Sequence, residues 1–299
     1  MKKMIVALLF VVFWIEGSVC IASSPDDMDS AAIGVSAIPF AAIYDSLKKD
    51  GVKVPIRSGM IVVRVVPGSP AERAKIKVND IILKVRGKSF RDTKTFIEVI
   101  GGLNVGKEYS FTGYSHFQIR GKSVWKKGTV KITPVTKREV ILGVLAKETD
   151  KVNDVTFYQH VNSPLHVNSR SEIYCYIVKP GEGKPYLRIK TQYVANDWLF
   201  VREISIKADD KKFVWDMSRF NDVERDNSGG KIWEWQDKTA TEKEIENLKL
   251  IAKALEVTIR YKGSQYRKDR EMGDNEKARL GEVLRAYQVL VNDSEKKSK

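Results

Sequence analysis

One segment in the first half of the chain constrains the fold more than any other. Residues 59–66 form an apolar run that predicts a strand, and Pro67-Gly68-Ser69-Pro70 then predicts a turn that opens a short helix at Ser69 and Pro70. A second apolar run, residues 81–85, ends in the turn sequence Arg86-Gly87-Lys88. Two strands on either side of a capped helix predict a compact unit that mixes helices with an antiparallel sheet.

The flanking residues extend this pattern. Residues 33–38 predict a strand, and residues 40–49 predict an amphipathic helix after Pro39. Asp92 is a suitable cap for a third helix, which Gly101-Gly102 would end, and strands are expected at 108–114 and 129–135. Residues 113–127, which include Trp125 and two lysines, are expected to form a long hairpin tip, either a plain loop or a contact with a membrane or partner.

This order of elements resembles the PDZ domains of periplasmic proteases of the high-temperature-requirement family, over about residues 30–137. The resemblance implies a module that binds the carboxyl termini of peptides or proteins, with residues 32–35 as the carboxylate-binding loop. Free backbone N–H groups beside a glycine can bind a carboxylate, and the next strand can pair with an incoming chain. The implied peptide-binding residues are Ala32, Ile33, Gly34, Val35, Ala37, Phe96, Ile97 and Ile100.

The sequence departs from the family pattern at three positions. Ala32 replaces an aromatic residue, Lys75 replaces a helix-ending glycine, and Asn79 replaces a second glycine. A side chain at a left-handed backbone position is costly, although asparagine tolerates it better than most residues. The alternative for Ile33, Val35, Phe96 and Ile100 is that they are ordinary core residues.

The first 22 residues predict a signal peptide. Lys2 and Lys3 precede an apolar run, and small residues follow near Ala22. A periplasmic or secreted protein is therefore expected, with an uncleaved membrane anchor as the alternative. Removal of residues 1–22 would leave Cys175 as the single cysteine, in an alternating strand pattern that favours a core position over a catalytic thiol.

The positive charge is concentrated in the first half of the chain. The chain has a formal net charge of +14, and residues 30–137 hold 20 basic and 7 acidic residues, a net of +13. This excess favours anionic partners such as acidic peptide tails or an anionic membrane surface, unless it is simply a solvated surface. No basic and aromatic motif typical of nucleic-acid recognition is present, so nucleic acid is not an expected partner.

The second half predicts a separate α+β domain over residues 152–292, mostly antiparallel sheet with helices at the carboxyl end. Aromatic-rich strands are expected at 186–191, 198–206, 212–215, 232–235 and 257–261. Thr241 and Glu244 form a capping box before an apolar helical stripe, residues 275–291 predict a final helix, and residues 293–299 a polar tail.

No catalytic constellation is evident. Asp226-Asn227-Ser228-Gly229-Gly230 resembles a serine protease nucleophile segment, but Asp226 stands where that family has glycine, and a turn between strands explains the segment better. The histidines and acidic residues show no metal-ligand spacing, and no cofactor is expected. The leading hypothesis is an exported adaptor that binds peptide termini, and the alternatives are a hydrolase in the second domain or a membrane-surface protein.

Overall fold

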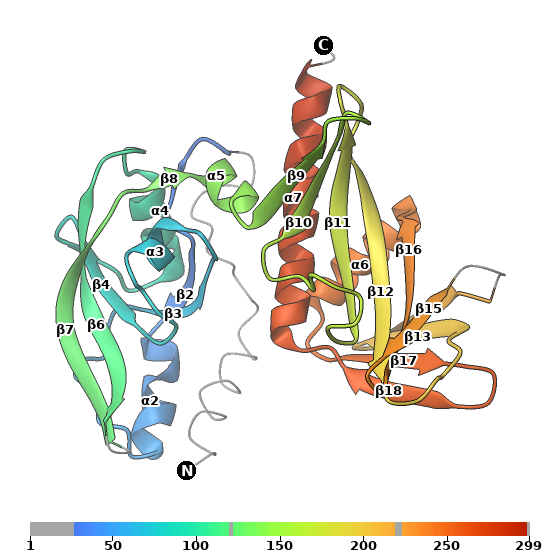
Figure 1. Ribbon diagram of the computed structural model, residues 1–299. Helices are drawn as coiled ribbons and strands as arrows, with labels where there is room; N and C mark the ends of the chain where they lie inside the picture. The colour runs from blue at the N-terminus through green and yellow to red at the C-terminus, as the bar shows by residue number, and fades with distance from the viewer. Residues whose placement is uncertain (1–26, 120–121, 219–222, 298–299) are drawn as a thin grey trace. The chain divides into compact units, whose positions relative to one another are not determined.

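A computed structural model describes residues 27–119, 122–218 and 223–297 of the protein. The chain divides into two compact units, residues 1–144 and 145–299, shown in Figure 1. The predicted signal peptide, residues 1–22, lies outside the described residues. Within the described part of the chain, no helix combines the length and apolar character needed to cross a bilayer.

The first unit is built around one antiparallel sheet with the strand order β2-β3-β4-β6-β7, in which β2 and β7 are the edges. A short strand β5 (Lys88–Ser89) pairs with β4, and β1 (Ala31–Ala32) pairs separately with β8 (Val135–Thr136). The main strands are β2 (Val35–Pro39), β3 (Met60–Val65), β4 (Ile81–Val85), β6 (Tyr109–Ile119) and β7 (Lys122–Ile132).

Two helices of this unit begin where the sequence predicts caps. Ser69 accepts a hydrogen bond from the Glu72 amide at the start of α3 (Pro70–Arg73), and Asp92 accepts one from the Thr95 amide at the start of α4 (Thr93–Gly101). The described residues of this unit also form α2 (Ala41–Lys49) and α5 (Lys137–Leu142). Lys75 and Asn79 both have positive φ angles, 62° and 74°, as the missing glycines require.

Alternation along the strands produces two apolar clusters. Met60 and Ile82 belong to the first, with Phe96 and Ile100 of α4. Their neighbours Ile61 and Ile81 belong to the second, with residues of α2. The sheet therefore separates two cores, one closed by α4 and the other by α2.

The expected hairpin tip is largely strand. β6 and β7 remain paired from Tyr109 opposite Ile132 to Ile119 opposite Lys122, without a register shift. The prediction that these strands end at residue 114 and restart at residue 129 was therefore wrong. Polar residues and glycines interrupt the apolar alternation there, which weakens the signal of a continued strand, although Tyr114 and Trp125 pack on one face against the core closed by α2.

In the part of the second unit that the structure describes there are two antiparallel sheets and two helices, in agreement with the predicted fold class. The larger sheet has the order β15-β16-β12-β11-β10-β9 and the smaller β14-β13-β17-β18. The strands are β9 (Leu145–Asp150), β10 (Val155–His160), β11 (Glu172–Pro180), β12 (Tyr186–Ala195), β13 (Glu203–Ala208), β14 (Lys211–Asp216), β15 (Glu224–Ser228), β16 (Lys231–Thr239), β17 (Val257–Lys262) and β18 (Arg267–Glu271). Helix α7 (Asp274–Lys297) packs against β10, β11 and α6 (Glu242–Lys253), as Figure 1 shows.

Three local expectations for this unit have clear outcomes. The strand expected at 198–206 begins only at Glu203, because Phe200 has a positive φ of 54°. Helix α7 continues to Lys297, through most of the expected polar tail. Gly229 and Gly230 form the turn between β15 and β16, so the protease-like segment is a hairpin.

Candidate functional site

The loop at Gly34 presents two backbone amides in one direction. The Ile33 carbonyl accepts a hydrogen bond from the Ala71 amide at 2.9 Å, and the Gly34 carbonyl accepts one from the Val66 amide at 2.8 Å. In a trans peptide the N–H group points opposite to the carbonyl of the same unit. The amides of Gly34 and Val35 therefore point away from residues 66–71, and such paired amides form an anion-binding concavity.

The strand that follows this loop has an unpaired side. β2 is the terminal strand of the sheet, and among the described residues β3 is its only partner strand. Because the Gly34 carbonyl points toward β3, alternation turns the backbone groups of Val35 away from it. The Phe40 amide bonds the Gly59 carbonyl at 2.8 Å, so the same alternation turns Ala37 outward beyond the bulge at Ser36 and Ala37. An incoming chain could pair with these groups.

The structure brings the predicted loop, strand and helix together, since α4 packs beside both β1 and β2. Most of the predicted side chains are, however, buried in the core. Ala32 is buried in the strand that pairs with β8, and Ile97 is partly buried. The others share the cluster closed by α4, each at most 2% exposed: Ile33, Val35, Ala37, Phe96 and Ile100. A peptide would therefore meet mainly backbone groups and Ile97 in the structure as it stands.

Two serines at this site were not predicted as site residues. Ser69, read from the sequence only as a helix cap, also bonds the Gly34 carbonyl through Oγ at 3.4 Å. The Ser36 hydroxyl is buried and has no hydrogen-bond partner among the described residues. A polar residue inside the apolar run 33–38 was the available signal for Ser36, and nothing local indicated the second role of Ser69.

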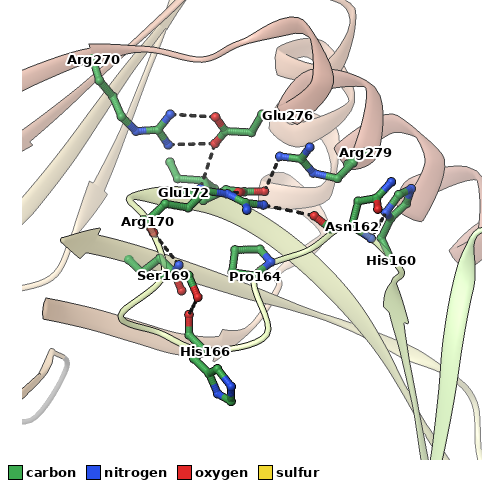
Figure 2. Close-up of polar contacts among 12 residues, drawn as sticks. His160, Asn162, Pro164, His166, Ser169, Arg170, Glu172, Arg270, Glu276 and Arg279 are labelled. Carbon is green, nitrogen blue, oxygen red and sulfur yellow. Dashed lines mark hydrogen bonds and ion pairs between the residues drawn. The ribbon is translucent and has the colours of Figure 1, made fainter. Parts of the chain in front are cut away.

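The second unit holds a buried network of charges where α7 meets β11, drawn in Figure 2. Glu172 accepts hydrogen bonds from Arg170 and, at 2.7 Å, from Arg279. Glu276 binds both terminal nitrogens of Arg270, at 2.7 and 2.8 Å, and accepts the Ile173 amide at 3.0 Å. Each buried carboxylate has an arginine partner, so this network fixes the helix on the sheet, and removing one partner would leave an unpaired buried charge.

Figure 2 also shows His160, a histidine that a hydrolase site in this unit would draw on. His160 Nε2 lies 3.0 Å from Glu282, and its Nδ1 accepts a hydrogen bond from the Asn162 amide at 3.0 Å. The His160 and Glu282 side chains are only 1% and 4% exposed, whereas Ser228 lies in an exposed strand. This arrangement is a buried structural pair and offers no support for a triad. Among the described residues, no group of three or more His, Cys, Asp or Glu residues could hold a metal ion.

Comparison with known proteins gives matches to the first unit. The PDZ domain family model matches residues 32–115. Among solved structures, the HtrA3 PDZ domain bound to a phage-derived ligand (FGRWV) is 25% identical, covering 35% of this chain and 84% of that chain with a TM-score of 0.27. The HtrA-type protease AlgW with decapeptide is 17% identical, covering 35% of this chain and 29% of that chain with a TM-score of 0.26. No curated protein matches the sequence.

The family match covers the loop at Gly34, the edge strand β2 and the helix α4, and it does not reach the second unit. The first unit of this protein therefore contains a PDZ domain.

Proposed function

We propose that the PDZ domain binds the carboxyl terminus of a peptide or protein along β2. The carboxylate would accept hydrogen bonds from the amides of Gly34 and Val35, and the preceding residues would pair with the outward backbone groups of Val35 and Ala37. The observation that carries this proposal is the unpaired edge of β2 directly after the glycine loop.

Burial of the side chains around β2 is expected to lower the affinity of the domain for a peptide. Phe96 and Ile100 of α4 pack in the same core as Ile33 and Val35, so a ligand side chain can enter between β2 and α4 only if the two separate. When only a fraction of the molecules is open, the apparent dissociation constant rises by the inverse of that fraction. We expect weak binding, in which the paired backbone contributes more than a deep side-chain pocket.

The cellular setting is part of the same proposal. The basic start and apolar run of residues 1–22 support export, and the protein would act in the cell envelope as an adaptor, either released or held by an uncleaved anchor. The excess of 13 positive charges over residues 30–137 supports ligands with acidic residues before the terminal carboxylate.

Peptides that differ only at the carboxyl terminus test this function. Fluorescein-labelled acidic peptides that end in valine or leucine would be titrated with the protein, each as the free acid and as the amide. We expect the free acids to bind at least tenfold more tightly. Equal affinity for acid and amide would contradict the proposal.

A substitution on α4 links that result to the groove. Ile97→Glu places a charge on the partly buried side of the helix and is expected to weaken binding of the free acids, whereas Glu98→Gln at the exposed neighbouring position serves as the matched control. If Ile97→Glu leaves the affinity unchanged, the ligand does not lie beside α4.

A further inference from the structure

The opposite end of the sheet has a feature that the groove at β2 does not use. Gly113 of β6 and Gly128 of β7 face each other in register, so neither strand supplies a side chain at that point. Alternation places both glycines on the face of the sheet that carries Phe111, a residue of the core closed by α4. A Cβ added to Gly128 would meet no atom within 4 Å, whereas one added to Gly113 would lie 2.2 Å from the Ile81 carbonyl oxygen of β4. The missing Gly128 side chain therefore leaves a depression in the sheet, and Gly113 lets β4 approach closely beside it.

This depression is a cavity of about 120 Å³. Apolar side chains form much of its wall, among them Ile76, Ile82, Phe111 and Val130. An apolar cavity of about 150 Å³ is large enough to hold benzene. The glycine cavity therefore has room for one aliphatic side chain.

Exposed apolar side chains continue from the cavity along the same face. Val130 lies next to the glycines, and farther out Phe117 and Val124 are direct partners across the two strands. These three side chains are 36%, 42% and 39% exposed, respectively. Single exposed apolar residues are common, but several on one face beside a cavity with apolar side chains in its wall are typical of a binding surface.

Positively charged side chains near the cavity favour an anionic partner. Lys75 at its rim is exposed, and so is Lys126, which lies opposite Ser115 on the same face. Asp80, the one carboxylate in the cavity wall, is buried and accepts the Lys77 amide at 2.9 Å. The rim therefore presents positive charge, which disfavours a second copy of the same face and favours a chain that carries carboxylates.

We propose that this face of β6 and β7 binds an extended acidic segment of a partner protein, which seats one aliphatic side chain in the glycine cavity. Carboxylates on either side of that side chain would lie near Lys75 and Lys126. The site is separated from the edge at β2 by the strands β3 and β4, so it needs no free carboxyl terminus and stands independently of the proposed groove.

The probe for this site is an acidic peptide with one central leucine, acetylated at one end and amidated at the other, and labelled with fluorescein. Blocking the terminus removes the carboxylate that the β2 groove would bind. We expect the full chain to raise the anisotropy of this peptide, and a peptide with serine in place of leucine to bind at least tenfold more weakly. Absence of binding at millimolar protein, or equal binding of the serine peptide, would overturn the proposal.

Gly128→Val tests the cavity without endangering the fold. A side chain at Gly128 meets no atom within 4 Å, and valine favours strands, so the variant should fold while its side chain fills the depression. We expect at least tenfold weaker binding, with an unchanged or raised melting temperature. Ser110→Val is the matched control, because Ser110 is exposed on the opposite face of the same hairpin and does not line the cavity. If Gly128→Val binds the peptide as well as the wild type does, the cavity is not the site.

Two further measurements separate the remaining outcomes. Lys126→Glu should weaken binding, whereas Lys127→Glu on the opposite face should weaken it less, and equal losses would indicate non-specific attraction and overturn the assignment. Sedimentation velocity tests the alternative that a second copy of the chain fills the cavity. A wild-type dimer that Gly128→Val abolishes would establish that alternative and overturn the proposal.

Discussion

Gly34 and Ser69 approach each other so closely that no side chain fits between them. A Cβ atom added to Gly34 would lie 2.2 Å from Ser69 Cβ and 2.7 Å from Ser69 Oγ. Gly34 also has a φ of +78°, which disfavours any other residue. The loop that presents its amides toward the open side of β2 therefore depends on glycine for two separate reasons.

Gly34→Ala should destabilise the first unit through both effects. The left-handed backbone costs roughly 1–2 kcal/mol for alanine, and forcing a methyl group against Ser69 adds about 1–3 kcal/mol. Thermal unfolding followed by circular dichroism would measure the loss. Gly51→Ala is the matched control, because Gly51 has a φ of +75° but nothing within 4 Å of an added Cβ. Equal losses in the two variants would show that the contact with Ser69 contributes nothing.

Glu234→Gln should destabilise the second unit. Its carboxylate accepts the amides of Leu199, Phe200 and Val201 at 2.9, 2.9 and 2.8 Å, and Arg225 lies 3.1 Å away. The glutamine amide group cannot accept on both atoms and leaves Arg225 without its carboxylate. We expect a loss of about 2–4 kcal/mol in the free energy of unfolding, measured in urea by tryptophan fluorescence.

The control for this prediction is Glu224→Gln on the neighbouring strand β15, where the side chain is exposed. That change should alter the free energy of unfolding by less than about 0.5 kcal/mol. A Glu234→Gln variant as stable as this control would mean that the three amides do not depend on the carboxylate.

Glu234 also shows why part of the second unit was unpredictable from the sequence. Trp198, Leu199 and Phe200 are strong strand formers, and an apolar run is the expected signal of a strand. The carboxylate that accepts the Leu199 and Phe200 amides lies more than 30 positions later in the chain. A local pattern carries no information about such a distant acceptor, so tertiary contacts overrode the propensity.

The first unit was more predictable because its signals are local. Ser69 and Asp92 cap their helices through bonds to amides three positions later. Pro67-Gly68 sets the turn between β3 and the helix that Ser69 caps. The glycine at position 34 is a similarly local signal, and it marks the loop that we propose as the carboxylate site. The exposure of the side chains around this loop could not be predicted from the sequence. Whether Ile33 or Phe96 faces a ligand or the core depends on how closely α4 approaches β2, and no short motif encodes that distance.

Cys175 should resist alkylation in the folded protein. The thiol is 1% exposed, and burial raises the pKa of Cys175 above its ordinary value, so little reactive thiolate forms. We expect iodoacetamide to modify Cys175 at least about 100-fold more slowly in the native protein at pH 8 than in urea, measured by mass spectrometry of the peptide. Comparable rates would place the thiol in an accessible site and reopen its chemical role.

Glu244→Gln should reduce stability more at neutral pH than in acid. Burial alone would raise the pKa of Glu244, but hydrogen bonds from Lys238, the Thr241 amide and the Thr241 hydroxyl outweigh it and hold the pKa below its ordinary value. A lowered folded-state pKa contributes stability above the unfolded-state pKa of about 4.3, and this stability is lost as the pH falls through the folded-state value.

For this partly exposed capping box we expect the variant to lose about 0.5–1 kcal/mol at pH 7. Unfolding in urea at pH 7 and pH 3, with wild type and variant side by side, should show the difference shrinking in acid, because the glutamate becomes protonated as the pH falls through its folded-state pKa. Glu246→Gln on the exposed face of the same helix should show little difference at either pH. A loss for Glu244→Gln that persists unchanged at pH 3 would mean that the glutamate stabilises the helix by packing, since its charge is then no longer involved.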